Sequence, residues 1–127
     1  GFSELLKAIR TAIKKRGYLL SLDGHPLPVR SEHSALNTLL QSAGAIVMKK
    51  ALVILDANLQ YIWSPGKDYE FVGLIHDEFQ ILVAPSADPQ FIGEAAVDSI
   101  TIAGEALKLR CRLTGEYRIG KNWKECH

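Results

Sequence analysis

Residues 71–84 have the sequence FVGLIHDEFQILVA. Two apolar runs, residues 71–75 and 79–84, are separated there by only three polar residues, His76-Asp77-Glu78. Short runs rich in aromatic and branched side chains, interrupted by a few polar residues, are typical of a β-hairpin. We therefore predict two antiparallel strands with His76, Asp77 and Glu78 at the tip that joins them.

The predicted tip carries two adjacent carboxylates, Asp77 and Glu78. Apolar strands hold a short turn in place, so carboxylates at its tip are positioned and remain accessible to a partner. Phosphoryl transfer needs hard oxygen ligands that hold magnesium against phosphate oxygens. An Asp-Glu pair is also found in ordinary polar turns, and the spacing alone leaves both interpretations open.

Helices and a second hairpin are predicted upstream of this segment. Ser31 is expected to cap a helix over residues 32–58, with an apolar face formed by Leu36, Leu39, Leu40, Val47 and Ile54. Before it, Ser3 is expected to cap a helix that ends at Gly17. Residues 18–22 and 26–29 then predict a short hairpin around Asp23-Gly24, which is a strong turn dipeptide.

Downstream of the predicted tip, the sequence indicates one more helix and an extended tail. Asp88-Pro89 is a typical helix start, and apolar residues recur after it at helical spacing: Ile92, Ala96, Ile100, Ala103 and Leu107. Residues 61–68 are expected to form a loop, and residues 109–117 an extended segment. These elements predict an α+β fold, with antiparallel β-hairpins packed against long helices in a single domain over residues 1–127.

A polar stripe is expected on the long predicted helix, because His33, Asn37 and Gln41 follow one another at i, i+4 spacing. Small side chains flank the stripe and would let a large partner approach closely. Amide groups can donate to the acceptors that every base pair presents in the DNA minor groove, so they test the shape of a pair without reading its sequence. An ordinary solvated helix face shows the same pattern.

Composition and charge exclude several classes of protein. The chain has 127 residues, of which 47% are hydrophobic and 23% charged, with a net charge of +1. The four histidines lack zinc-type spacing, and two cysteines do not form a disulfide framework, which favours a reduced intracellular protein. The longest apolar stretch, residues 43–55, is interrupted by Lys49 and Lys50, so we expect no membrane-spanning helix.

Three segments, in order along nearly the whole chain, resemble phage-type family-A DNA polymerases. Residues 29–45, VRSEHSALNTLLQSAGA, are similar to the minor-groove helix of that family. His76-Asp77-Glu78 resembles its carboxylate motif C, and residues 120–127, GKNWKECH, resemble its C-terminus. The resemblance implies a DNA-directed DNA polymerase that transfers nucleotides from dNTPs to a primer 3′-hydroxyl.

The resemblance also implies roles for individual residues. Asp77 and Glu78 would be ligands of catalytic magnesium, of which the complete enzyme uses two ions, and His76 would contact the primer terminus. Duplex DNA would be contacted by four residues: Arg30, His33, Asn37 and Gln41. The C-terminal residue His127 would pack near the active site together with Trp123.

Parts of the family pattern are not found in these 127 residues. The second catalytic aspartate, on another palm strand, the fingers helix and the thumb have no counterpart. We therefore expect the C-terminal part of a polymerase palm, inactive alone, whose partners are primer–template DNA, dNTP and the remaining polymerase segments. The expected location is the bacterial cytoplasm, with a phage or prophage gene and no membrane partner. The alternative is a non-catalytic, duplex-binding accessory module derived from a polymerase.

Overall fold

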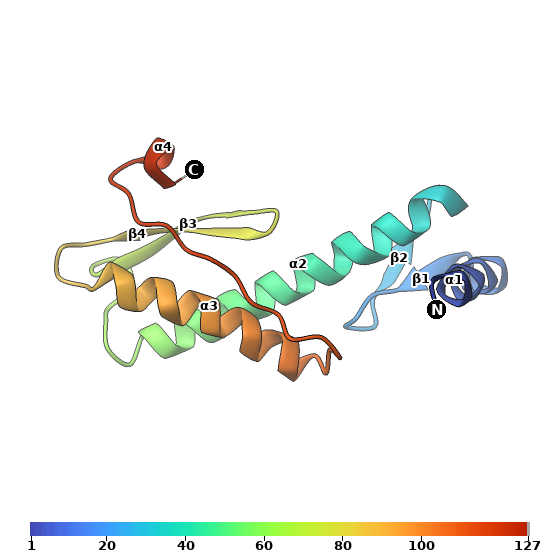
Figure 1. The fold of residues 1–127 in the computed structure, drawn as a ribbon, viewed down its shortest axis with the longest axis horizontal. Helices are drawn as coiled ribbons and strands as arrows, with labels where there is room; N and C mark the ends of the chain where they lie inside the picture. The colour runs from blue at the N-terminus through green and yellow to red at the C-terminus, as the bar shows by residue number, and fades with distance from the viewer. Residues whose placement is uncertain (127) are drawn as a thin grey trace. The chain divides into compact units, whose positions relative to one another are not determined.

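The structure is a computed structural model, and it describes residues 1–126. Internal contacts divide the chain into two compact units, Gly1–Ile46 and Val47–His127. The long helix α2, Glu32–Leu59, contributes its first half to one unit and its second half to the other. Figure 1 shows the order of the elements along the chain. The expectation of a single domain over residues 1–127 stays a prediction.

The first unit combines helix α1, Phe2–Arg16, with a small hairpin and the start of α2. Helix α1 begins before Ser3, so the prediction of Ser3 as its cap is wrong, whereas Gly17 ends the helix in a left-handed conformation as predicted. Strands β1, Tyr18–Leu20, and β2, Pro26–Pro28, pair antiparallel. The core of this unit is formed by Ile9, Leu19 and Ala35.

Helix α2 confirms the predicted long helix, with a single residue of difference at its C-terminal end. The Ser31 hydroxyl accepts the N–H of Ser34 at 3.3 Å, which satisfies a free donor of the first turn as a cap does. Leu40 is exposed, so its assignment to the apolar face is wrong. By length and composition α2 is apolar enough to cross a membrane, a test that core helices of soluble proteins also pass.

The second unit contains the hairpin predicted from residues 71–84. Strands β3, Tyr69–Ile75, and β4, Glu78–Val83, pair antiparallel, with a β-bulge between Phe71 and Gly73. Ile75 opposes Glu78, so the tip consists of only His76 and Asp77. The prediction that Glu78 lies in the tip is therefore wrong, because this residue is the first of β4.

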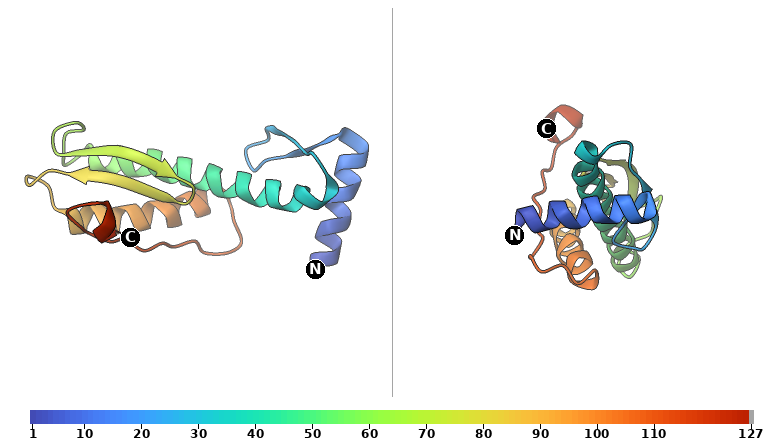
Figure 2. Two further views of the ribbon diagram at one scale, coloured as in Figure 1. Left: turned by 90° about the horizontal axis from the view of Figure 1, so that it is seen from above. Right: turned by 90° about the vertical axis from the view of Figure 1, so that its right-hand side faces the viewer.

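Two helices pack against the β3–β4 hairpin. Figures 1 and 2 show helix α3, Pro89–Ala106, running beside the second half of α2. The Asp88 carboxylate caps α3 by accepting the N–H of Gln90 at 2.9 Å, as the Asp88-Pro89 start predicted. The core between hairpin and helices consists of five buried residues: Leu55, Leu59, Tyr69, Ala87 and Ile92.

The chain then continues past α3 without forming another strand in the described part. Residues 109–120 form neither helix nor strand, and a short helix α4, Trp123–Cys126, follows. Both sheets of the described residues are two-stranded. The α+β class with antiparallel hairpins and long helices is confirmed.

Candidate functional site

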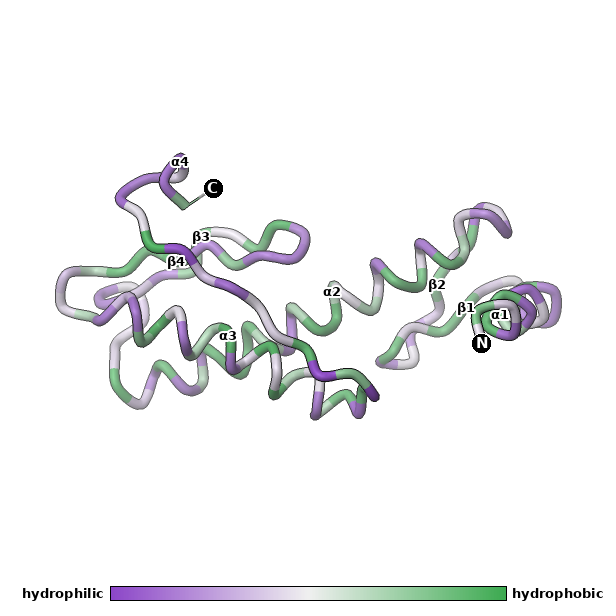
Figure 3. Tube along the Cα trace, in the orientation of Figure 1, coloured by the Kyte–Doolittle hydropathy of each residue, from purple (hydrophilic) through white to green (hydrophobic). Residues whose placement is uncertain are grey.

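The tip of the β3–β4 hairpin carries the first candidate residues. His76 and Asp77 are both exposed there, and Figure 3 shows a hydrophilic tip joining two more apolar strands. His76 has a φ of 54°, in the left-handed region that residues other than glycine seldom adopt. Such backbone conformations cluster at functional sites, where the surrounding structure holds them in place. Asp77 is thus presented to solvent by a tight two-residue turn.

Glu78 lies beside Asp77 but is held differently. As the first residue of β4 it is half-buried, and its Oε1 accepts a hydrogen bond from the Gln80 side-chain amide at 3.0 Å. Residues 78 and 80 point to the same side of the strand, opposite to Phe79, which packs on the core. The two adjacent carboxylates therefore differ in freedom: Asp77 is in the turn, and Glu78 is fixed on the outer face of the hairpin.

Asp68, the last residue of the predicted loop 61–68, closes the other end of the hairpin. Its carboxylate accepts the Ser86 hydroxyl at 2.6 Å and the N–H of Ser64 at 2.9 Å. These hydrogen bonds, the one from the Ser86 hydroxyl first, hold the pKa of Asp68 below its usual value. Asp68 thus ties the loop before β3 to the loop after β4.

Tyr69, the first residue of β3, joins the hairpin to α2. Its side chain is buried, and its hydroxyl donates to the Asp56 carboxylate at 2.7 Å. Burial first, and then the bond to Asp56, raises the pKa of Tyr69 well above its usual range, so the group remains a neutral donor. Together with Asp68, this contact fixes the base of the hairpin.

The predicted polar stripe lies in the first unit. His33, Asn37 and Gln41 are all exposed, and so is Arg30 just before the helix. Of the small residues around the stripe, Gly44 and Ala45 are exposed, whereas Ala35 is buried and belongs to the core of the unit. The open surface therefore extends along the helix from His33 towards Gly44.

His33 also borders a small cleft between α1 and α2. The cleft has a volume of about 180 Å³ and is lined by Leu6, Ile9, Arg10, Glu32, His33 and Leu36. Arg10 and Glu32 approach each other across it at 3.5 Å, with both side chains largely exposed. The neighbourhood of His33 thus combines an apolar floor with charged groups at its rim.

Within residues 1–126, no three His, Cys, Asp or Glu side chains are grouped so that they could hold a metal ion. Asp77 and Glu78 supply the hard oxygen donors that magnesium prefers, but as a pair only. His127 lies outside the described residues, so its predicted place near the site has no structural account.

Comparison with known proteins places the fold and these residues in context. The family described as DNA polymerase family A matches residues 3–125. The DNA-directed DNA polymerase of Enterobacteria phage T3 is 37% identical over 118 residues, covering 89% of this chain and 16% of that protein. The corresponding polymerase of Escherichia phage T7 is 35% identical over 118 residues, with the same coverage.

A more distant relative is DNA polymerase I of Aquifex aeolicus (strain VF5), which is 26% identical over 124 residues, covering 96% of this chain and 21% of that protein. The chain thus spans about a sixth of the length of the phage relatives and about a fifth of the bacterial one. The family match runs through the stripe, the hairpin and α3 without a break. This chain belongs to DNA polymerase family A.

Proposed function

We propose that this chain is the C-terminal palm portion of a DNA-directed DNA polymerase and supplies motif-C carboxylates and minor-groove contacts to nucleotidyl transfer. The observation that carries the proposal is the exposed Asp77 in a two-residue turn, inside a segment that matches family A over residues 3–125. The relatives from phages T3 and T7 are named DNA-directed DNA polymerases. The reaction would join the primer 3′-hydroxyl to the α-phosphate of a dNTP and release pyrophosphate.

The two carboxylates have separate parts in this proposal. Asp77 would be the principal magnesium ligand, because it is exposed at the tip, and Glu78 an auxiliary acid beside it. Two bound magnesium ions would supply charge stabilisation for the attacking and the leaving oxygens. Asp68 and Tyr69 act at a distance, since the hydrogen bonds at the base of the hairpin keep the tip in position. His76 would contact the primer terminus from the same turn.

The exposed stripe would meet the newly formed duplex. Asn37 and Gln41 can donate to the purine N3 and pyrimidine O2 acceptors, which all four base pairs present in the minor groove. His33 and Arg30 would contact DNA on the same side of the helix. In this proposal the tip and the stripe would serve one duplex.

The site is proposed to be completed by other segments of the enzyme. The β3–β4 sheet has only two strands in the described part, so a further strand bearing the second aspartate can pair at its edge. Fingers and thumb would hold the dNTP and the primer–template. The proposed location of the complete enzyme is the bacterial cytoplasm, because its relatives are polymerases of phages and bacteria.

The test is an alanine scan of the turn in the polymerase reconstituted from this chain and the remaining segments. We expect Asp77→Ala to slow single-turnover primer extension by about a thousand-fold or more, with duplex affinity nearly unchanged. Glu78→Ala should cost less, and Asp98→Ala, which removes an exposed carboxylate on α3, should have no effect. Normal turnover by Asp77→Ala with intact DNA binding would instead support the non-catalytic, duplex-binding module.

A further inference from the structure

The C-terminal segment follows the surface of α3 over most of the length of the helix. Figure 1 shows the segment after α3 turning back along this helix towards the β3–β4 hairpin. Residues 93, 97, 100, 101 and 104 of α3 are spaced so that they form one stripe on the helix. Four of them contact the segment, so it is held on the helix at several points: Gly93, Ile100, Thr101 and Gly104.

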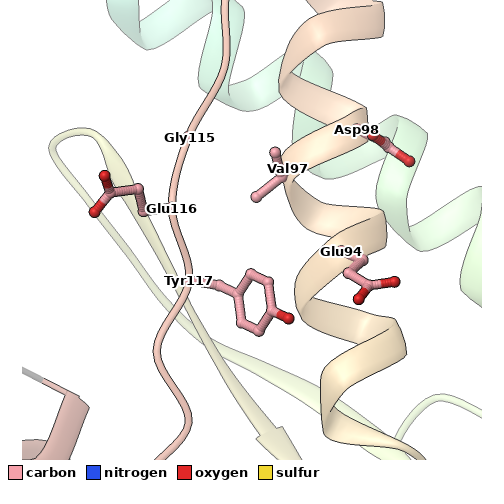
Figure 4. A pocket seen from close by; sticks show the side chains of 6 residues that line it. All are labelled: Glu94, Val97, Asp98, Gly115, Glu116 and Tyr117. Atoms are coloured by element: carbon pink, nitrogen blue, oxygen red, sulfur yellow. The ribbon is translucent and has the colours of Figure 1, made fainter.

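The tightest of these contacts joins Tyr117 to Gly93. A Cβ atom added to Gly93 would lie 2.3 Å from Cδ2 of the Tyr117 ring, far inside any real contact distance. Figure 4 shows the Tyr117 ring pointing from the segment towards α3, whereas the Glu116 side chain points away from the helix. The ring therefore rests directly on helix backbone, at a place that only glycine leaves open.

Farther along α3, two more turns of the helix hold the segment. A Cβ atom on Gly104 would lie 3.1 Å from Cγ of Leu113, and the Thr101 hydroxyl donates to the carbonyl of Leu113 at 2.7 Å. A Cβ atom on Gly115, in the segment itself, would lie 3.0 Å from Cδ1 of Ile100. Close approach is thus built from glycines on both sides of the contact.

Beside Tyr117 the contact leaves an open groove of about 450 Å³. Its lining comprises Glu94, Val97, Asp98, Gly115, Glu116 and Tyr117. Apart from the tyrosine ring and Val97, its side chains are acidic, and Figure 4 shows the ring between the segment and the helix as the main bridge across it. The tyrosine ring is therefore a contact between α3 and the end of the segment that leads to α4.

We infer that Tyr117 is a positioning residue: by resting on Gly93 it holds the C-terminal segment on α3 and thereby sets the place of residues 120–126. Gly93 lies inside a helix, where glycine is less favourable than alanine. Glycine therefore lowers the stability of the helix at this position, but it leaves the space that the Tyr117 ring occupies. The catalytic consequence rests on the proposed function and on the family resemblance, which implies that Trp123 packs near the active site.

The first experiment compares Gly93→Ala with Gly44→Ala in the chain of 127 residues. Both changes favour helix, but a Cβ atom at Gly44 meets nothing within 4 Å, whereas at Gly93 it displaces Tyr117. We expect trypsin cleavage after Arg118 and Lys121 to accelerate about five-fold or more in Gly93→Ala only. Equal cleavage rates in both variants and the parent chain would overturn the inference.

The second experiment examines the tyrosine itself. Tyr117→Phe retains the ring and should keep the parent cleavage rate, while Tyr117→Ala should match the acceleration of Gly93→Ala. If the two residues act through one contact, the double variant Gly93→Ala/Tyr117→Ala should be cleaved no faster than either single variant. Additive acceleration would show that the two residues act separately, and would overturn the pairing.

The third experiment measures primer extension by the reconstituted polymerase. Gly93→Ala and Tyr117→Ala should lower kcat several-fold while KM for primer–template stays within two-fold, and Tyr117→Phe should restore kcat. A loosened tail with unchanged kcat would refute the positioning role while leaving Asp77 unaffected. Conversely, full activity of Asp77→Ala together with a normally protected tail would refute the proposed function and leave the contact of Tyr117 with Gly93 in place.

Discussion

The two compact units of the chain carry opposite net charge. Gly1–Ile46 has six Lys and Arg residues against three Asp and Glu, a net charge of +3, while Val47–His127 has nine against eleven, a net charge of −2. A positive surface favours contact with a polyanion, and a negative one favours cations. The net charge of +1 of the whole chain is therefore the sum of a basic unit and an acidic unit.

The units also differ in how firmly they hold their candidate residues. Asn37 and Gln41 are exposed side chains on a helix face, and no tertiary hydrogen bond of the described residues fixes their amides. Asp77 sits in a two-residue turn whose strands are anchored through Asp68 and Tyr69 at the opposite end. The strands that carry Asp77 therefore have more tertiary hydrogen bonding than the amides of Asn37 and Gln41.

The largest effect is expected when the two regions are tested for primer extension without the other polymerase segments. The purified chain alone should extend a primer at less than about a thousandth of the rate of the complete polymerase, because one carboxylate pair cannot hold two metal ions against a triphosphate. Primer extension with added magnesium and all four dNTPs measures this, after contaminating polymerase has been excluded with an Asp77→Ala preparation. Robust extension would mean that the missing strand is dispensable.

Core substitutions should show whether the two regions unfold separately. Leu55 is fully buried in the second unit, so we expect Leu55→Ala to lower the free energy of unfolding by about 2–5 kcal/mol. Val53→Ala, at an exposed position of the same helix, should change it by less than about 0.5 kcal/mol. Thermal unfolding followed by circular dichroism measures both, and a shift of only one of two transitions would demonstrate independent units.

The polar stripe offers a matched pair of substitutions on one helix. Asn37→Ala should weaken discrimination against extending a mispaired primer by about 2- to 10-fold, the worth of a single hydrogen bond, with little change in overall affinity. Asn58→Ala removes an exposed amide from the second unit and should leave discrimination unchanged. Lower affinity with a reduced salt dependence, and unaltered discrimination, would place Asn37 on phosphates instead.

The smallest effect concerns pH and the base of the hairpin. The pKa of Asp68 is lower in the folded chain, so its contribution to stability is present above the unfolded pKa near about 4 and is lost as pH falls through the folded value. Ser86→Ala should raise this pKa towards its usual value and flatten the loss of stability below about pH 4.

NMR titration of the Asp68 carboxylate measures the change directly. Ser64→Ala is the control, because residue 64 donates through its backbone N–H and this bond survives the substitution. An unchanged pKa in Ser86→Ala would show that the Ser86 hydroxyl does not support the base of the hairpin.

Local signals predicted much of the fold. Ser31 and Asp88 cap their helices through side-chain contacts with residues two or three positions away, so the starts of α2 and α3 were visible in the sequence. The length of the tip could not be predicted from the sequence, because it depends on which residues oppose each other across the strands. Pairing of Ile75 with Glu78 places the glutamate in β4, and Leu40 is exposed although helical spacing predicted it on the apolar face.

The candidate site was only partly accessible to the same reasoning. An Asp-Glu pair between apolar runs fits a metal site and a polar turn alike, so the roles of Asp77 and Glu78 rested on the resemblance to a family. Asp68 and Ser86 are 18 positions apart, and nothing local marks their contact. Gly93 did leave a signal, since a glycine inside an otherwise regular helical pattern often marks the close approach of another segment.

Because β3 contains a bulge, the direction in which the tip points can change without a change in the strand pairing that stabilises the hairpin. Val72 is the extra residue between the pairs Phe71↔Ile81 and Gly73↔Gln80, so a chain lacking Val72 could keep every cross-strand pair. It would lose the bend and added twist that a bulge imposes on a strand. Evolution or a protein engineer could therefore redirect Asp77 by inserting or deleting a single residue, while the apolar face of the hairpin stays on the core.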